Sequence, residues 1–365
     1  MAVPPLAIHG AGLFCGVGAT AAASCAAIRC GMNNFQEIAF TNSEGEAIIG
    51  SPVDLDEPAY GVTRLAKLAA RPIAECFAAA AGEEPSRIPV ILCLAEPDRP
   101  GLPEHLPQVL PREIERELGM PLHPMSSVLQ QGHVGAAVAL LQARRLLQEA
   151  HCPRVIIAGS DSFIVDDTLA AYDKDRRLLT RSNSNGFIPG EAGSAVLVGG
   201  WGSERASALA LRGLGFAREP ASFGSGKPLR AEGLVQAIGG ALGESGIALK
   251  DCDYRIADAN GEQYRFKEAS LAITRLLRER KGRFGLWHPG DCIGEVGAAT
   301  LPAMLAMLHA GAVKSYLPGP VFLGHIGNDD GKRAAFVAHA TTTQPLALEA
   351  AAQSAYTLKR RSVAA

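Results

Sequence analysis

Short apolar runs alternate along the chain with longer segments in which apolar residues recur at helical spacing. The runs at 88–94 (IPVILCL) and 154–158 (RVIIA) are typical of buried strands, and 62–81, which Gly82 follows, is typical of a long helix. Further strands are predicted at 5–10, 121–130, 194–200, 209–213, 254–257, 283–287, 321–323 and 334–340, and further helices at 19–30, 110–118, 132–147, 232–242, 266–280 and 294–310. This alternation predicts a largely parallel α/β fold.

A short internal repeat indicates two related halves. The hexapeptide Gly-His-Val-Gly-Ala-Ala at 132–137 is matched by Gly-Glu-Val-Gly-Ala-Ala at 294–299, and each opens an apolar helix. Ala/Gly-rich helix starts also resemble one another by chance, but the recurring strand–helix order favours duplication. We therefore expect one half at 1–203, a second at 204–345, and an Ala-rich tail at 346–365 that is partly helical or disordered.

Charge and composition exclude several classes of function. The chain has 35 basic and 37 acidic residues, so no basic excess is available to bind nucleic acid, and aromatic residues make up only 5%. Apolar residues never run on for the roughly 18 positions that a membrane span requires. We expect a soluble cytoplasmic protein with no nucleic-acid or membrane partner.

Neither a metal nor a cofactor is expected. The eight cysteines form no C-x-x-C pair and are typical of reduced, mostly buried thiols in a cytoplasmic protein. The glycines at 10, 12 and 16 predict a Gly-rich turn after the first strand, but their spacing does not match the G-x-G-x-x-G of dinucleotide-binding proteins.

Four blocks, in order along the chain, carry a resemblance to a known family. They are Ile-His-Gly-Ala-Gly at 8–12, Tyr-Asp-Lys-Asp at 172–175 with Asn-Gly-Phe-Ile-Pro-Gly-Glu-Ala-Gly at 185–193, Ala-Asp-Ala-Asn-Gly at 257–261, and Pro-Gly-Asp-Cys-Ile-Gly-Glu-Val-Gly-Ala at 289–298. They resemble the blocks of the β-ketoacyl synthase branch of the thiolase superfamily. The resemblance implies a thiolase-like five-layered αβαβα fold of two duplicated halves, and a dimer in which strands near 121–130 pair across a twofold axis.

The departures from the family pattern fall on its catalytic residues. The position of the nucleophilic Cys corresponds to Gln131 or Gly132, and no Cys occurs between Cys93 and Cys152. The resemblance places Asn260 and Asp291 where the family has its two His, and Leu286 where it has a Lys. The closing Gly-rich loop is degraded at 323–331. Since loss of such a set costs factors of at least about 10³, no Claisen condensation by the family mechanism is expected.

Three residues near these positions offer alternative chemistry. His133 is a candidate general base oriented by Asp291, or a helix-start His bonded to the backbone. Cys292 is a candidate activated thiol or a buried free Cys, and His288 a candidate catalytic or structural residue. For each of the three we favour the structural interpretation.

The sequence favours a protein that acts by binding. The first hypothesis is a catalytically degenerate β-ketoacyl synthase-like pseudoenzyme of fatty acid or polyketide biosynthesis: a partner subunit, an adaptor, or an acyl- or ligand-binding module. The alternative is an acyl-thioester enzyme, a decarboxylase or acyltransferase, with non-standard catalytic residues. The expected partner is a second copy or a ketosynthase-like subunit. Basic patches at 176–177, 278–281 and 359–361 are typical of solvated faces, although one could receive an acyl carrier protein.

Overall fold

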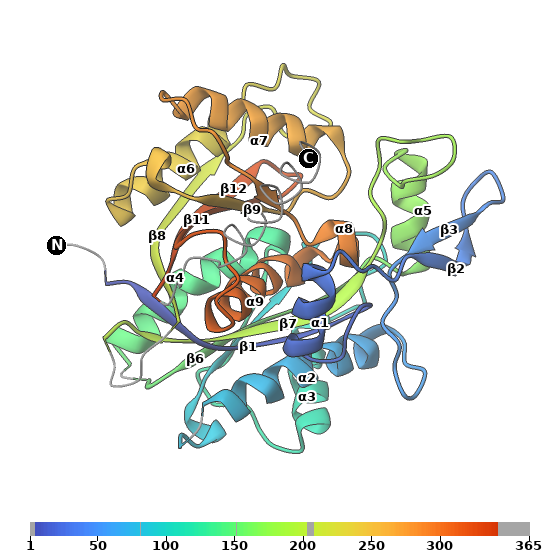
Figure 1. The fold of residues 1–365 in the computed structure, drawn as a ribbon. Helices are drawn as coiled ribbons and strands as arrows, with labels where there is room; N and C mark the ends of the chain where they lie inside the picture. The colour runs from blue at the N-terminus through green and yellow to red at the C-terminus, as the bar shows by residue number, and fades with distance from the viewer. Residues whose placement is uncertain (1–3, 81, 151, 203–207, 342–365) are drawn as a thin grey trace, which may run out of the picture.

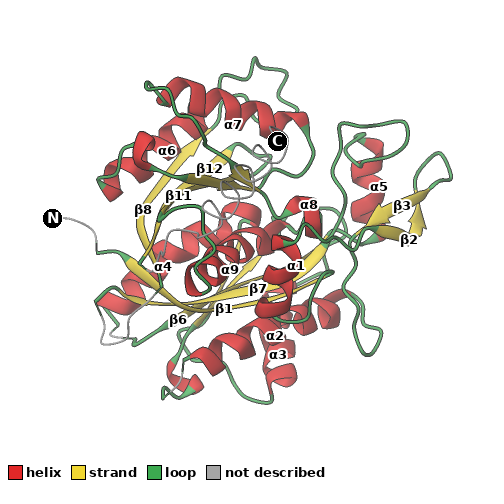
Figure 2. Ribbon diagram, viewed as in Figure 1, coloured by secondary structure: helices red, strands yellow, loops and turns green. Residues whose placement is uncertain are grey.

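The computed structural model describes residues 4–80, 82–150, 152–202 and 208–341. Its elements form five layers, with helices outside each of two sheets and further helices between the sheets (Figures 1 and 2). The expected boundary at 203/204 and the expected tail at 346–365 lie outside the described residues, so both remain proposals. The five-layered αβαβα architecture is confirmed.

The first half contributes five strands in one sheet. Its order is β5-β4-β6-β7-β1, with β4 parallel to β5 and β6, and β7 antiparallel to β6 and β1. The strands are β1 (Leu6–Cys15), β4 (Val90–Leu94), β5 (Ser127–Gln130), β6 (Val155–Ser162) and β7 (Glu191–Gly200). In chain order within the half, this arrangement reads third, second, fourth, fifth, first.

The second half repeats that arrangement strand for strand. Its order is β10-β9-β11-β12-β8, with β9 parallel to β10 and β11, and β12 antiparallel to β11 and β8. The strands are β8 (Leu209–Arg218), β9 (Tyr254–Ala257), β10 (Leu286–Trp287), β11 (Val321–Gly327) and β12 (Lys332–Ala340). Identical order and identical directions in both halves confirm the duplication.

The two sheets meet at their first strands. Leu6, Ala7 and Ile8 of β1 pair antiparallel with Leu211, Ala210 and Leu209 of β8. This short ladder makes one continuous ten-stranded sheet of the two halves. The remaining two strands, β2 (Gln36–Thr41) and β3 (Ala47–Gly50), form a separate hairpin beside α5 (Asp166–Lys174), away from the five layers (Figure 1).

The helices separate into outer and central layers. The outer helices are α2 (Gly61–Ala79) and α3 (Leu106–Leu118) on the first half, and α6 (Glu232–Ser245) and α7 (Gln263–Leu276) on the second. The central layer holds α4 (Gly135–Gln148) and α9 (Thr300–Val313), with α1 (Ala21–Arg29) and the single turn α8 (Gly290–Ile293) beside them. Helix α9 is apolar all round and almost wholly buried, as expected for a helix between two sheets.

Two sequence expectations are corrected here. Gly10 and Gly12 lie within β1 and not in a turn, because α2 packs so closely on the strand that a Cβ on Gly12 would overlap the backbone of Pro72. The helix expected at 294–310 begins only at Thr300, after α8 and the 3-10 turn η4 (Gly297–Ala299). Both corrections concern local backbone geometry, which the spacing of apolar residues does not encode.

Candidate functional site: a closed polar cluster between the halves

Each central helix begins with a 3-10 turn that starts at a left-handed glycine. Gly132 (φ +54°) opens η2 (Gly132–Val134) before α4, and Gly297 (φ +48°) opens η4 before α9. The residues before them, Gln131 and Val296, also share backbone angles. The structure therefore pairs Gly132 with Gly297, whereas the repeated hexapeptides would pair Gly132 with Gly294.

Of the two candidate nucleophile positions, Gly132 is the one at which a side chain would have to displace a neighbouring carboxylate. A Cβ built on Gly132 would overlap the carboxylate of Glu96. Arg99 holds Glu96 at 3.3 Å and makes a bidentate bond to Asp161 at 2.6 and 2.9 Å. Asp161 in turn lies where a Cβ on Gly297 would be. Two carboxylates joined by one guanidinium thus occupy the space beside both turn glycines.

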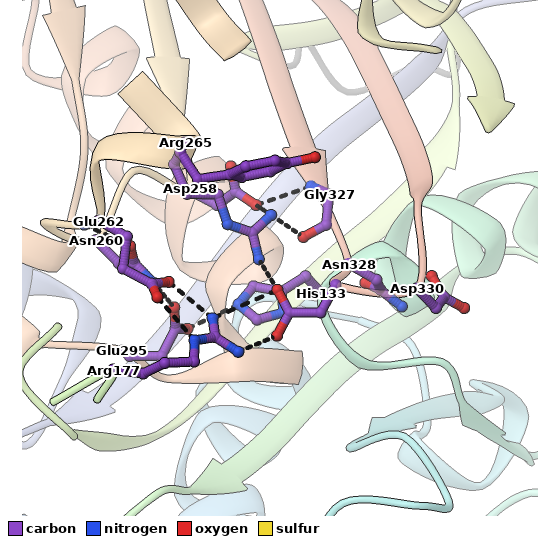
Figure 3. A network of polar contacts seen from close by, with 12 residues as sticks. His133, Arg177, Asp258, Asn260, Glu262, Arg265, Glu295, Gly327, Asn328 and Asp330 are labelled. Carbon is purple, nitrogen blue, oxygen red and sulfur yellow. Dashed lines mark hydrogen bonds and ion pairs between the residues drawn. The ribbon is translucent and has the colours of Figure 1, made fainter. Parts of the chain in front are cut away.

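His133, the residue after Gly132, bonds across the halves to Glu295 (Figure 3). His133 Nε2 lies 2.7 Å from Glu295 Oε1, which also accepts from the Gly297 N–H at 2.9 Å. Asn260 Nδ2 donates to Glu295 Oε2 at 2.6 Å. The side chains of His133 and Glu295 are 7% and 5% exposed, so the pair is closed to solvent. We call His133, Asn260 and Glu295 the central cluster.

Within the central cluster, His133 and Glu295 form an ion pair at neutral pH. Burial alone would lower the pKa of His133, but the charge of Glu295 and its hydrogen bond to the ring outweigh burial and raise this pKa to about 9. Burial favours neutral Glu295, yet the charges of His133 and Arg265 hold its pKa well below the usual range. A protonated imidazole is no general base, and both carboxylate oxygens already accept hydrogen bonds.

Two arginines surround the central cluster with further ion pairs (Figure 3). Arg177 binds Glu262 through two bonds of 2.7 and 2.8 Å, and Asp329 through one of 2.6 Å. Arg265 pairs with Asp329 at 3.1 Å and with Asp258 at 3.4 Å. Glu262 Oε2 also accepts a 3.3 Å bond from Asn260, which links this network to the central cluster.

Asn328 closes the turn at Gln131. Its Oδ1 accepts from the Val134 N–H at 3.1 Å, and its Nδ2 donates to the Gln131 carbonyl at 2.8 Å. Free N–H groups at a helix start are the usual donors to a developing oxyanion. Here the Val134 donor is already occupied by a side chain of this same chain.

The other expected site residues lie outside the central cluster. Asp291 does not orient His133, because Glu295 does; the Asp291 side chain is 72% exposed and pairs with His288 at 3.2 Å. Cys292 is buried, which raises its pKa to about 11, the reverse of an activated thiol. His288 packs edge-on against Phe266 with ring centroids 5.5 Å apart. Of the candidates, the structure brings His133 and Asn260 together in the central cluster, and Asp291 and His288 together outside it.

Sequence reasoning missed Glu295 and Glu96. Glu295 could have been found: it stands in the repeated hexapeptide at the place of His133, and opposite charges at matched positions of two halves indicate a pair. Nothing in the local sequence points to Glu96, which reaches Gly132 only because β4 lies beside β5 in the sheet.

Solved ketosynthase structures share this fold over nearly the whole chain. The ishigamide ketosynthase/chain length factor superposes with a TM-score of 0.75 at 15% identity, over 93% of this chain and all of the other. A ketosynthase–chain length factor complex (ApeO with ApeC, Xenorhabdus doucetiae) gives 0.72 at 13%, covering 93% and 98%. A type II polyketide ketosynthase with its acyl-carrier protein (AntDE:AntF) gives 0.77 at 12%, covering 93% and 100%. The fold of the chain is therefore ketosynthase-like.

The match found by sequence covers less of the chain than the match found by structure. The chain is 31% identical over 191 residues to a putative polyketide β-ketoacyl synthase 2 of Streptomyces cyaneus, and that match spans 45% of this chain and 44% of the relative. No family model matches this chain. Across the described parts of the chain, none of its helices combines the length and apolarity needed to cross a bilayer.

Proposed function

We propose that this ketosynthase-like chain is a non-condensing partner subunit, comparable to a chain length factor, that binds a condensing ketosynthase. The observation that carries the proposal is at Gly132: the space for a nucleophilic side chain is filled by the Glu96 carboxylate. The central cluster beside it is a neutralised ion pair, and no thiol is hydrogen-bonded to its three residues in the described structure. Acyl transfer to the protein needs a free nucleophile.

The free edge of the first half supports the partnership. Strand β5 is the last strand on its side of the ten-stranded sheet and bonds only to β4 within it. All four of its residues are half-buried, and Met125 just before it is 44% exposed. An uncovered edge that carries apolar side chains can be completed by a partner strand, which agrees with the dimer that the family resemblance implies.

The chemical test uses malonyl and acyl thioesters of an acyl carrier protein. We expect no decarboxylation above the buffer rate and no acyl adduct on the intact protein by mass spectrometry. Turnover, or a covalent adduct on any cysteine, would refute the non-condensing assignment and favour the acyl-thioester enzyme. The control is a ketosynthase with its Cys and both His, assayed alongside with the same substrates.

The association test uses a purified condensing ketosynthase from the same organism. Light scattering coupled to gel filtration should show a one-to-one complex, and Met125→Lys should weaken it about tenfold by placing a charge at an apolar contact. Met32→Lys is the matched control, because Met32 is 60% exposed and follows α1, which packs against β1 and α9. A homodimer that Met125→Lys weakens would show that the β5 edge is the interface but that the partner is a second copy of this chain. A chain that stays monomeric in every mixture would overturn the proposal.

An acyl carrier protein has fewer candidate surfaces than the sequence suggested. Arg177 of the expected patch at 176–177 is buried among Glu262 and Asp329, so it cannot serve as a docking charge. The patch at 359–361 lies outside the described residues. The segment 278–281 is half-buried to exposed and remains the place we propose for carrier docking.

A further inference from the structure

A cavity of about 320 Å³ lies between α1, β10, α8 and the end of α9, apart from the central cluster. The helices that form it are neighbours in Figure 1, and Cys292 Sγ of α8 contacts the Ile28 carbonyl of α1 at 3.9 Å. The wall is mainly apolar or aromatic and includes Ile28, Leu286, Trp287, Met307 and Tyr316. At about 30 Å³ per water-sized group, such a volume accommodates roughly ten non-hydrogen atoms.

The two cysteines of the wall belong to its apolar part. Burial raises the pKa of Cys25 to about 12 and that of Cys292 to about 11, so both thiols are neutral at physiological pH. Neutral buried thiols behave as small apolar groups. The walls therefore suit a hydrocarbon or aryl body, as small-molecule pockets generally do.

The charges around the cavity favour an anion. Arg29 lines it and stacks over the Tyr316 ring at 4.1 Å. Lys314, which caps α9, does not line the cavity, but its charge acts on Cys25 of the wall. In the described structure neither cation is paired with a carboxylate, and the Asp291 carboxylate also lines the cavity, 3.2 Å from His288. Two exposed cations thus face one carboxylate, and the excess positive charge favours an anion.

We propose that this cavity binds a small amphipathic monocarboxylate of about ten non-hydrogen atoms, with its apolar body against Trp287 and Met307 and its carboxylate at Arg29 and Lys314. The proposal stands independently of the partner-subunit function, since no residue of the central cluster lines the cavity.

Trp287 reports occupancy directly. The chain has two tryptophans, so Trp201→Phe leaves Trp287 as the only one. Titration of that variant with 8-bromooctanoate should quench Trp287 in a saturable curve, because bromine quenches on contact, and octanoate should reverse the quenching. The Trp287→Phe variant keeps Trp201 as a control and should show no saturable quenching.

The charge preference is tested with chains of equal length. Octanoate should bind about tenfold more tightly than octan-1-ol or octylamine, and Arg29→Gln with Lys314→Gln should remove that preference while octan-1-ol binding is unchanged. The double variant Arg87→Gln with Lys227→Gln removes two exposed charges elsewhere and should bind octanoate normally. Non-saturable quenching, equal binding of the three chains, or octanoate binding that survives loss of both cations would each overturn the proposal.

Discussion

His133 Nε2 and Glu295 Oε1 lie 2.7 Å apart, and the two residues are the sole difference between the repeated hexapeptides at 132–137 and 294–299. Each half thus supplies one member of a buried ion pair from the same place in its sequence motif. Their backbones are not equivalent, because Gly132 matches Gly297 in the fold. The pair therefore joins the halves through side chains of opposite charge and not through symmetry.

The first prediction concerns this ion pair. His133→Met or Glu295→Met should each lower the free energy of unfolding by about 3–5 kcal/mol, because each leaves the other charge buried without its partner. His133→Met combined with Glu295→Met should cost less than either single change. Urea unfolding of the four proteins measures the coupling. Strictly additive losses would show that the two side chains do not act as a pair.

The pair also makes stability depend on pH. The pKa of His133 is raised to about 9 in the folded chain from an ordinary value near 6.5. Protonation therefore stabilises the fold fully below about pH 6.5, and this contribution, on the order of 3 kcal/mol, is lost as the pH rises through about 9. The difference in unfolding free energy between the natural chain and His133→Gln should shrink across this window. A constant difference from pH 6 to 9.5 would contradict the assignment.

Gly132→Cys should lower the stability of the fold. The new Cβ would take a left-handed φ, which costs roughly 1 kcal/mol, and would displace the Glu96 carboxylate from its contact with Arg99, so we expect a total loss of about 1–2 kcal/mol. Gly246→Cys is the control for strain alone, since Gly246 has φ +67° and a Cβ built on it would meet no neighbouring atom within 4 Å. Adding Glu96→Ala should recover part of the lost stability in the Gly132→Cys background and none of it in the Gly246→Cys background. Thermal unfolding of the variants measures the difference.

A thiol at the neighbouring position should not restore condensation. Gln131→Cys leaves Asn260 and the His133–Glu295 ion pair in place, so no free imidazole is added to activate a thioester carbonyl. Carbon–carbon bond formation from acyl and malonyl thioesters is expected to stay at background. Product formed by this single variant would contradict the roles assigned to the central cluster.

Thiol reactivity should be confined to one residue. Cys30 is the one exposed cysteine among the eight, all of which are described. Burial raises the pKa of the other seven, strongly at Cys76 and Cys93. A native titration with a disulfide reagent should release one equivalent rapidly, and Cys30→Ser should remove it. Rapid reaction of several thiols would contradict the burial.

Much of the layered fold follows from the sequence because apolar runs and helical spacing report burial directly. The α2 and α6 regions and the buried strands β4, β6 and β9 lie where the pattern predicts them. The hairpin β2–β3 and helix α5 were not predicted. Both are short and largely exposed, and their contacts come from a small aromatic cluster around Phe163 and Phe187 that the chain assembles from distant segments.

The site was less predictable than the fold. The family pattern led to Asp291, but the turn α8 carries that residue to the surface and Glu295 takes the place at His133. Arg177 looked like part of a solvated patch, yet it is 8% exposed and held by Glu262 and Asp329. Both errors arise from long-range contacts, which decide whether a charge is buried and which partner it meets.

The guanidinium of Arg99 makes the surroundings of the two turn glycines interdependent. It holds Glu96 beside Gly132 and Asp161 beside Gly297, so loss of either carboxylate leaves the other as its remaining counter-ion. A substitution at the turn of one half is therefore transmitted to the turn of the other half through a single side chain.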